Sequence, residues 1–183
     1  LVLAFRFHEL NVPGLIRIEP AVFPDQRGWF SERWRADLFL ENDIGPFVQD
    51  NLSRSETGVL RGLHYQLEPA VQGKLVQCLT GSILDVAVDI RRHSSTFGEW
   101  VAETLSAENH RLLYLPPGFA HGFLVLAGPA LVQYKVTAGY VPDLDRGIRW
   151  DDPDIGIQWP VKTPVLSEKD ADLPLLKDAE VLG

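Results

Sequence analysis

Short segments with a β-type pattern of apolar and polar positions run through the middle of the chain, separated by turn-forming residues. In residues 83–90 the even positions from Leu84 to Ile90 are apolar and share one face, whereas Asp85 and Asp89 lie on the other. Strands are expected at 47–53, 74–80, 83–90, 100–105, 111–115, 121–126 and 131–137, with a turn at residues 81–82. This spacing predicts an all-β sandwich or barrel rather than a doubly wound sheet.

Helix-forming segments are scarce. Residues 36–42 and 168–172 each predict one short helix, and the chain after Gly147 is rich in Pro, Asp and Trp. That last part is expected to wrap the strands irregularly. No repeat, low-complexity tract or change of composition marks a second domain. The pattern therefore predicts one domain over residues 1–183, an all-β jelly-roll barrel with a few short helices.

The composition is that of an ordinary globular chain and limits the classes of function. Its 183 residues are enough to bury a core, and 45% of them are hydrophobic. No apolar run reaches the roughly 18 residues of a membrane-spanning helix. The net charge of −8 argues against general binding to nucleic acids or anionic membranes. A phosphorylated ligand therefore needs a confined basic cluster.

Two features bear on the compartment. Residues 1–10 contain Arg6, His8 and Glu9 and lack the charged start and uninterrupted apolar centre of a signal peptide. Cys78 is the only cysteine, which excludes an intrachain disulfide framework and a cysteine-based zinc site. We therefore expect a cytoplasmic location.

The first candidate for chemistry is His64, which follows Arg61 and Gly62 closely. Strict alternation places Arg61 and His64 on opposite faces of a strand. Gly62 permits a bulge or a close approach that turns both side chains toward one cavity. In that arrangement His64 is a base near an anion site. The alternative is a histidine that caps a loop at the rim of the barrel.

Two further strand residues have side chains suited to catalysis. Lys74 begins a strand with apolar neighbours, so its ammonium group can stabilise an enolate or bind phosphate in a partly enclosed space. Tyr134, in the strand at 131–137, is a candidate proton donor. A solvated lysine at a strand end and a tyrosine that only packs its ring are the alternatives.

Residues 116–123 place His121 at the end of a Pro-x-x-x-x-His pattern, which resembles the second sequence motif of the cupin superfamily. In metal-binding cupins this histidine ligates the metal together with two histidines and a glutamate of a first motif. The corresponding residues here are His64, Tyr65 and Gln66, without a second histidine or a glutamate at ligand spacing. We therefore expect no metal and no other cofactor.

Together, these segments are similar to the dTDP-4-dehydrorhamnose 3,5-epimerase family along nearly the whole chain. The matching segments are 23–32, 47–51, 58–64, 81–89, 117–123, 134–135, 147–153 and 166–170. One departure is Trp29, where many relatives have another aromatic residue. The resemblance implies a metal-free, cupin-like barrel that epimerises a dTDP-4-keto-6-deoxy sugar.

The resemblance also implies catalytic roles. The ketone at C4 of such a sugar acidifies the protons on C3 and C5, and inversion needs a base, an acid and a cation near the enolate. His64 is implied as the base, and Asp170 as the carboxylate that orients and polarises it. Tyr134 is implied as the acid on the opposite face, and Lys74 as the cation.

Substrate-binding roles carry over in the same way. Arg61 matches a position near the phosphates, and His121 matches a substrate-contacting position. Asp85 is implied to orient a neighbouring polar group. The nucleotide side is implied for Gln49, Asn51 and Tyr140, and weaker matches are Asp145 and Lys169.

The family resemblance also implies a homodimer. Arg27 and Glu32 match residues that one subunit supplies to the nucleotide site of its partner. We further expect residues 2–7 to add a strand to the sheet of the neighbouring subunit.

Three alternatives remain at this stage. Some members of the family invert mainly one centre, and they share His64, Lys74, Tyr134 and Asp170. A metal-dependent cupin enzyme that uses His64 and His121 is the second alternative. The third is a sugar-nucleotide-binding module on the same barrel without catalytic activity.

Overall fold

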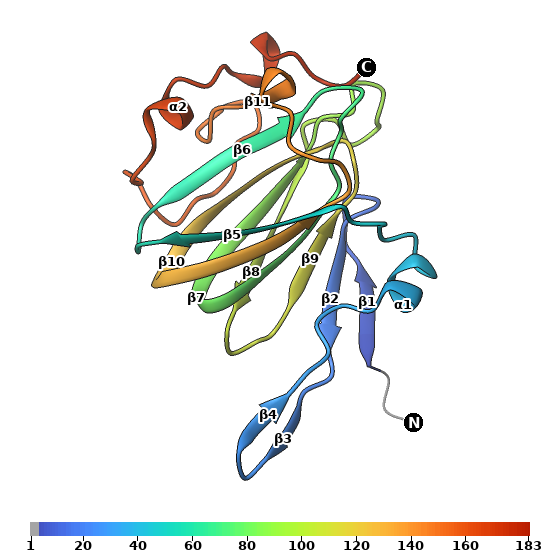
Figure 1. Cartoon of the computed structure of the whole chain (residues 1–183). Helices are drawn as coiled ribbons and strands as arrows, with labels where there is room; N and C mark the ends of the chain where they lie inside the picture. Colours follow the sequence, from blue (N-terminus) through green and yellow to red (C-terminus); the bar gives the residue numbers. More distant parts are fainter. Residues whose placement is uncertain (1–3) are drawn as a thin grey trace.

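Two long strands form the centre of the molecule (Figure 1). The structure is a computed structural model and describes residues 4–183. Strand β7 (Lys74–Asp89) and strand β10 (Phe119–Val136) pair antiparallel from Phe119 opposite Asp89 to Val136 opposite Lys74. Their register shifts between Val125 and Val132, where both strands bend. Each strand therefore contributes its two halves to two different layers.

The first layer follows the order β1-β2-β9-β7-β10-β5 and the second the order β8-β7-β10-β6-β11. The short strands are β1 (Phe5–Glu9), β2 (Ile16–Pro20), β5 (Gln49–Ser55), β6 (Leu60–Gln66), β8 (Trp100–Ser106), β9 (Leu112–Leu115) and β11 (Asp145–Gly147). The order does not return to its start, so the predicted all-β jelly roll is confirmed as an open barrel.

The prediction of a turn at residues 81–82 is wrong, because β7 continues through Gly81 and Ser82. Gly81 has a φ of +74°, and a Cβ atom there would lie 2.3 Å from the carbonyl oxygen of Ala127. A glycine is therefore needed where the two long strands bend against each other. For the same reason, the strands expected at 121–126 and 131–137 are one continuous strand, β10.

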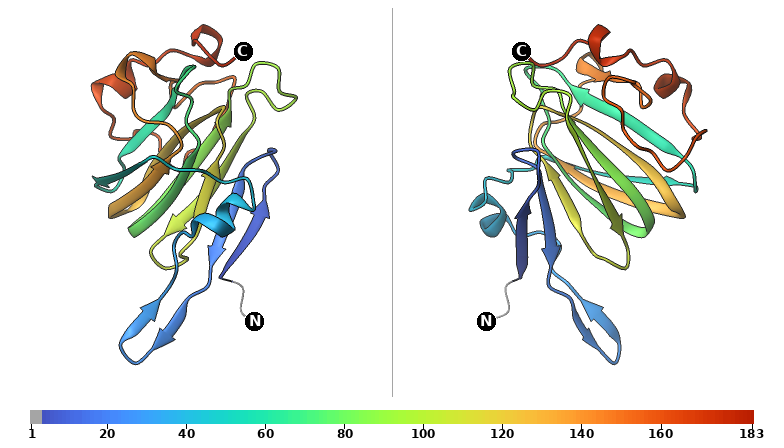
Figure 2. Two further views of the ribbon diagram at one scale, coloured as in Figure 1. Left: turned by 45° about the vertical axis from the view of Figure 1, so that its right-hand side comes forward. Right: turned by 180° about the vertical axis from the view of Figure 1, so that it is seen from behind.

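Strand β7 is apolar on both faces because both faces are covered. Ile83 and Ala87 point between the layers and pack in the main core with residues such as Phe123. Val86 and Val88 face the other way, as the alternation predicted, and pack against the irregular C-terminal segment in a second cluster. That segment wraps the second layer, as expected (Figure 2).

The remaining elements lie outside the two layers. Strands β3 (Phe23–Asp25) and β4 (Gly28–Phe30) form a separate hairpin that projects away from the sandwich (Figures 1 and 2). Helices α1 (Ala36–Leu40) and α2 (Glu168–Ala171) lie where two helices were predicted and end one or two residues earlier. Two short 3₁₀ turns are η1 (Pro142–Leu144) and η2 (Leu176–Asp178).

The N-terminal strand β1 pairs with β2 of its own chain and forms one edge of the sheet. Residues 2 and 3 of the expected exchanged segment lie outside the described residues, so that exchange stays a prediction. None of the helices in residues 4–183 is long and apolar enough to cross a membrane.

Candidate active site

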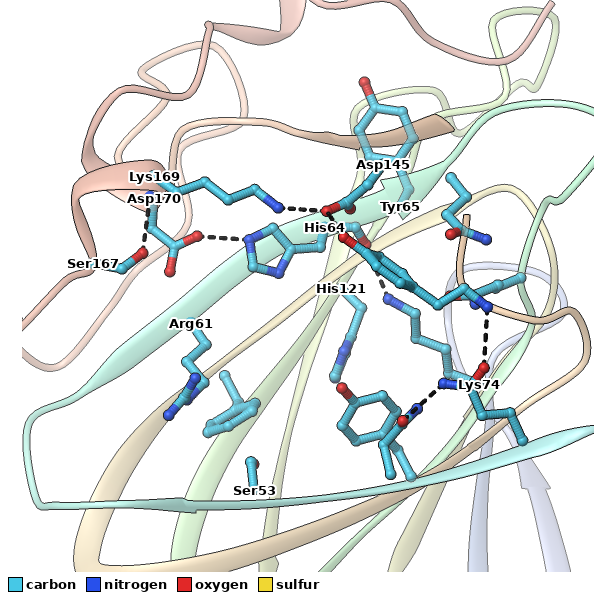
Figure 3. Close-up of a pocket in the computed structure, with 17 residues that line it drawn as sticks. Ser53, Arg61, His64, Tyr65, Lys74, His121, Asp145, Ser167, Lys169 and Asp170 are labelled. Carbon is cyan, nitrogen blue, oxygen red and sulfur yellow. Dashed lines mark hydrogen bonds and ion pairs between the residues drawn. The ribbon is translucent and has the colours of Figure 1, made fainter. Parts of the chain in front are cut away.

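A cavity of about 450 Å³ opens between the two layers, beneath the C-terminal segment (Figure 3). It brings together all but three of the residues predicted to form the site. Those lining it are Gln49, Asn51, Arg61, His64, Lys74, His121, Tyr134, Tyr140, Asp145, Lys169 and Asp170. Residues from six separate parts of the chain therefore converge on one space.

Strand alternation explains why Lys74 and Tyr134 face this cavity. Val76 and Val132 point into the main core, and Lys74 and Tyr134 stand two positions from them on the same faces of β7 and β10. The two residues also lie close across the ladder, since Tyr134 pairs with Val76 and Val136 pairs with Lys74. On the inner face of the first layer, the core residues Val76 and Val132 are thus followed directly by the cavity residues Lys74 and Tyr134.

The glycine effect predicted at Gly62 is confirmed. Gly62 has a φ of +119°, and a Cβ atom there would lie 2.5 Å from the Cα atom of Gly122 and 2.7 Å from the carbonyl oxygen of His121. At this point the register between β6 and β10 shifts. The irregularity brings both Arg61 and His64 to the same cavity, although they are three positions apart and strict alternation would place them on opposite faces (Figure 3).

His64 and Asp170 form a hydrogen-bonded pair, with 2.6 Å between Nε2 and Oδ1. The hydroxyl of Ser167, the N-cap of α2, accepts a hydrogen bond from the Asp170 backbone N–H. Burial raises the pKa of the Asp170 carboxyl, but hydrogen bonds from His64 and Ser167 outweigh it, so the net pKa lies below its usual value.

The negative charge of Asp170 determines which ring nitrogen of His64 carries the hydrogen. An ionised carboxylate can only accept a hydrogen bond, so Nε2 of a neutral His64 carries the hydrogen. Nδ1 then keeps the free lone pair. This pairing prepares His64 to take a proton from a bound molecule.

Lys74 is a buried cation with a lowered pKa. Lys74 is only 7% exposed, and its Nζ donates a hydrogen bond to the backbone oxygen of His64 at 3.1 Å. Burial lowers the pKa of the amine to about 8, although the nearby carboxylates of Asp145 and Asp85 act in the opposite direction. The cavity therefore contains a positive charge that is poorly solvated and able to stabilise an anion.

A second histidine–carboxylate pair lies deeper. Nε2 of His121 is 2.8 Å from Oδ1 of Asp85, and both residues are buried. The His121 ring also lies 6.5 Å from the ring of Tyr134. Burial raises the pKa of Tyr134 while Arg61 opposes the rise, so the phenol keeps its proton at neutral pH. Asp85 thus sits behind His121 and does not line the cavity itself.

The other end of the cavity is a hydrogen-bonded polar group around Asp145. Its carboxylate accepts hydrogen bonds from the Tyr140 hydroxyl at 3.2 Å and from the Lys169 ammonium group. Gln49 accepts from the Tyr140 backbone N–H at 3.0 Å and donates to the Asn51 side chain at 2.8 Å. These five residues form one continuous chain of contacts.

Arg27 and Glu32 are not at the cavity of their own chain. Arg27 lies in the turn of the projecting hairpin, where its guanidinium pairs with Asp25 at 2.5 Å. Glu32 follows the hairpin. Their assignment to the site of a partner subunit stays a prediction.

Several cavity residues were not predicted from the sequence, among them the polar residues Ser53, Gln66, Gln72 and Ser167. Ser53 was detectable, because Gln49, Asn51 and Ser53 alternate with outward residues along β5. Ser167 also had a signal as a serine just before an acidic helical turn.

The histidines are not arranged as metal ligands. Within residues 4–183, no three His, Cys, Asp or Glu side chains are grouped to hold a metal ion. Gln66, which stands where a metal-binding cupin carries a histidine, donates its amide hydrogens to the backbone oxygens of Ala70 and Gly139. The donor set therefore does not fit a three-ligand site, and the absence of a metal stays a prediction.

The comparison with known proteins agrees with this geometry. A sequence model described as dTDP-4-dehydrorhamnose 3,5-epimerase matches residues 9–178. The chain belongs to this family. It is 52% identical over 173 residues to a dTDP-4-dehydrorhamnose 3,5-epimerase of Shigella flexneri. This alignment covers 93% of this chain and 95% of the relative. The family is one of isomerases.

Solved structures extend the likeness to the fold. The dTDP-6-deoxy-D-glucose-3,5-epimerase of Legionella pneumophila, determined with dTDP-4-keto-L-rhamnose, has a TM-score of 0.92 at 47% identity, covering 95% of this chain and 94% of that one. A 3′-monoepimerase of Streptomyces bikiniensis, determined with dTDP-quinovose, has a TM-score of 0.88 at 36% identity, covering 93% and 87%. The epimerase fold is thus shared between enzymes that differ in the centres they invert.

Proposed function

We propose that this chain inverts C3 and C5 of dTDP-4-dehydro-6-deoxy-D-glucose and so forms dTDP-4-dehydro-L-rhamnose in dTDP-rhamnose biosynthesis. The observation that carries the proposal is the hydrogen bond between His64 and Asp170 at the wall of a cavity that also contains Lys74 and Tyr134. The described chain acts as a single domain without metal or cofactor.

The chemistry follows from these four side chains. Nδ1 of His64 takes the proton from C3 or C5, and the electron pair of the broken C–H bond forms the enolate with its charge on the C4 oxygen. The ammonium group of Lys74 stabilises that oxygen. Tyr134 returns a proton to the carbon from the opposite face, which inverts the centre. Asp170 stabilises the imidazolium of His64 while the enolate exists.

Most of the other residues predicted for the site bind the nucleotide half of the substrate. Arg61 contacts the diphosphate, since a guanidinium pairs well with phosphate oxygens. Gln49, Asn51 and Tyr140 lie toward the base, with Asp145 and Lys169 beside Tyr140. His121, held by Asp85, contacts the sugar.

The protein acts as a cytoplasmic homodimer in this proposal. Val48 and Leu52 are exposed apolar residues on the outward side of the β5 edge, and Leu79 of β7 is exposed on the same face. A second copy that covers this face removes apolar surface from water. Arg27 and Glu32 then complete the neighbouring nucleotide site. Full activity of a monomer in size-exclusion and kinetic assays contradicts this part.

The proposed reaction is tested by NMR in heavy water. Wild-type protein is incubated with dTDP-4-keto-6-deoxyglucose, and deuterium is followed at C3 and C5. Deuterium at both carbons supports the proposal, and deuterium at one identifies a single-centre epimerase. No exchange at either overturns it and favours a binding module. A stoichiometric metal that tracks activity contradicts the metal-free mechanism.

A further inference from the structure

The segment of residues 138–141 carries Tyr140 and connects β10 to the 3₁₀ turn η1. It is not part of a strand, and Tyr140 is 55% exposed. Each of its four residues nevertheless has one backbone N–H or C=O group that is hydrogen-bonded to a side-chain amide. Such bonds replace the sheet ladder that the backbone has left.

Three glutamines from three different parts of the chain make these bonds. Gln72 donates to the Ala138 oxygen at 2.8 Å. Gln66 donates to the Gly139 oxygen at 3.1 Å and accepts from the Val141 N–H at 2.7 Å. Gln49 accepts from the Tyr140 N–H at 3.0 Å. We call Gln49, Gln66 and Gln72 the glutamine clamp.

The clamp is itself held in place. Gln66 is only 2% exposed, and its amide also donates to the backbone oxygen of Ala70 at 2.7 Å. Gln49 donates to Asn51 on the same strand at 2.8 Å. Because the amides of Gln49 and Gln66 each use both their oxygen and their nitrogen in hydrogen bonds, their orientation is fixed before any ligand arrives.

Tyr140 is therefore restrained at two points although its ring is exposed. Its backbone N–H is bound by Gln49, and its hydroxyl donates to Asp145 at 3.2 Å. An exposed aromatic ring that is ordered without packing is suited to bind another flat ring, since little conformational freedom is lost on binding.

We propose that the glutamine clamp positions Tyr140 against the base of the nucleotide and so sets the affinity for dTDP without acting in proton transfer. This inference rests on the proposed function, in which Tyr140 lies at the nucleotide side. Gln66 and Gln72 are positioning residues, because they touch the backbone of the Tyr140 segment and act through it, whereas Gln49 also lies at the nucleotide side itself.

The experiment compares Gln72→Ala and Gln66→Glu with Gln158→Ala as the matched control. Gln158 also donates to a backbone oxygen, that of Gly156, but at an exposed site outside the cavity. Gln66→Glu keeps an acceptor for the Val141 N–H and loses the donors to Gly139 and Ala70. The Kd for dTDP is measured by calorimetry, and kcat and KM by deuterium exchange, after thermal melting has confirmed folding.

Both clamp variants are expected to raise the Kd and KM about tenfold while kcat stays within about threefold. Gln158→Ala is expected to change neither. In a Tyr140→Ala background, Gln72→Ala is expected to change the Kd less than about twofold, because the clamp acts through Tyr140. If Gln66→Glu does not fold, Gln72→Ala and the double variant decide.

Three results overturn the inference. If wild-type protein binds dTDP and folded Gln72→Ala has an unchanged Kd, the proposed role of the clamp is contradicted while the proposed function stands. A fall in kcat at unchanged Kd places these residues in the chemistry instead. Wild-type protein that does not bind dTDP overturns the proposed function and the clamp with it.

Discussion

Nε2 of His64 lies 2.6 Å from Oδ1 of Asp170, although the two residues are 106 positions apart in the chain. His64 belongs to a strand of the second layer, whereas Asp170 belongs to helix α2 in the irregular C-terminal segment. That segment is anchored on the sheet by buried residues such as Ile155 and Ala179. The packing of the C-terminal segment therefore determines how the His64 imidazole is oriented.

We expect Asp170→Asn to lower kcat by about 10²-fold or more, because an amide can donate to Nε2 and favour the tautomer whose Nδ1 is protonated. Folding should persist, since the side chain keeps its size. The kinetics of deuterium exchange measure the effect. The matched control is Asp172→Asn, a neighbouring exposed carboxylate, which should behave as wild type. Equal activity of both variants contradicts a role for Asp170.

Tyr134→Phe separates proton removal from inversion. Phenylalanine fills the same volume but has no proton to donate to the opposite face. We expect product formation to fall by about 10²-fold, while deuterium exchange that returns to the starting configuration falls by less than about tenfold. NMR of the recovered substrate distinguishes the two. Parallel loss of exchange and product indicates instead that Tyr134 acts in the first proton removal.

Lys74 gives the enzyme an alkaline limit. Its pKa of about 8 predicts that kcat/KM falls as the pH rises through that value, since the neutral amine cannot stabilise the enolate oxygen. The measurement is a pH profile of kcat/KM between pH 6 and 10 in wild type and Lys74→Met. The variant should have about 10²-fold lower activity and no loss centred near pH 8. A wild-type profile flat to pH 9.5 contradicts the assignment.

The same lysine should reduce stability. Burial disfavours its charged form, so the unfolded chain binds more protons between pH 8 and 10.5, and the free energy of unfolding rises with pH across that window. At neutral pH we expect Lys74→Met to be more stable than wild type by about 1–3 kcal/mol. Urea unfolding at pH 7 and pH 10 measures this. A variant less stable than wild type at pH 7 shows that the ammonium group is well compensated.

Most of the cavity residues were predicted through the family resemblance, whereas strand alternation predicted which residues within one strand share a face. The alternation of residues 83–90 correctly placed Asp85 and Asp89 opposite Val86 and Val88. The course of the chain at Gly81 was not predictable, because a glycine with positive φ serves equally in a tight turn and in a bent strand. The role of Gln66 was also missed, because its partners lie in a distant loop.

The close approach at Gly62 can be tested against a glycine without one. In Gly62→Ala the new methyl group meets the backbone of Gly122 and His121, whereas in Gly58→Ala it has nothing within 4 Å. Both glycines have positive φ, +119° at Gly62 and +81° at Gly58, so the control accounts for part of the backbone strain. We expect Gly58→Ala to cost about 1–2 kcal/mol of stability and Gly62→Ala at least about 2 kcal/mol more, with loss of activity. Equal melting temperatures contradict this packing.

The most direct test of His64 as the base is deuterium exchange by His64→Asn, with dTDP affinity measured on the same protein. Asparagine keeps a polar side chain of similar width but cannot take a proton at neutral pH. We predict that exchange at both C3 and C5 falls by about 10³-fold or more while the Kd for dTDP stays within about threefold of wild type. Exchange at either carbon within about tenfold of wild type contradicts the account, because another group must then remove that proton.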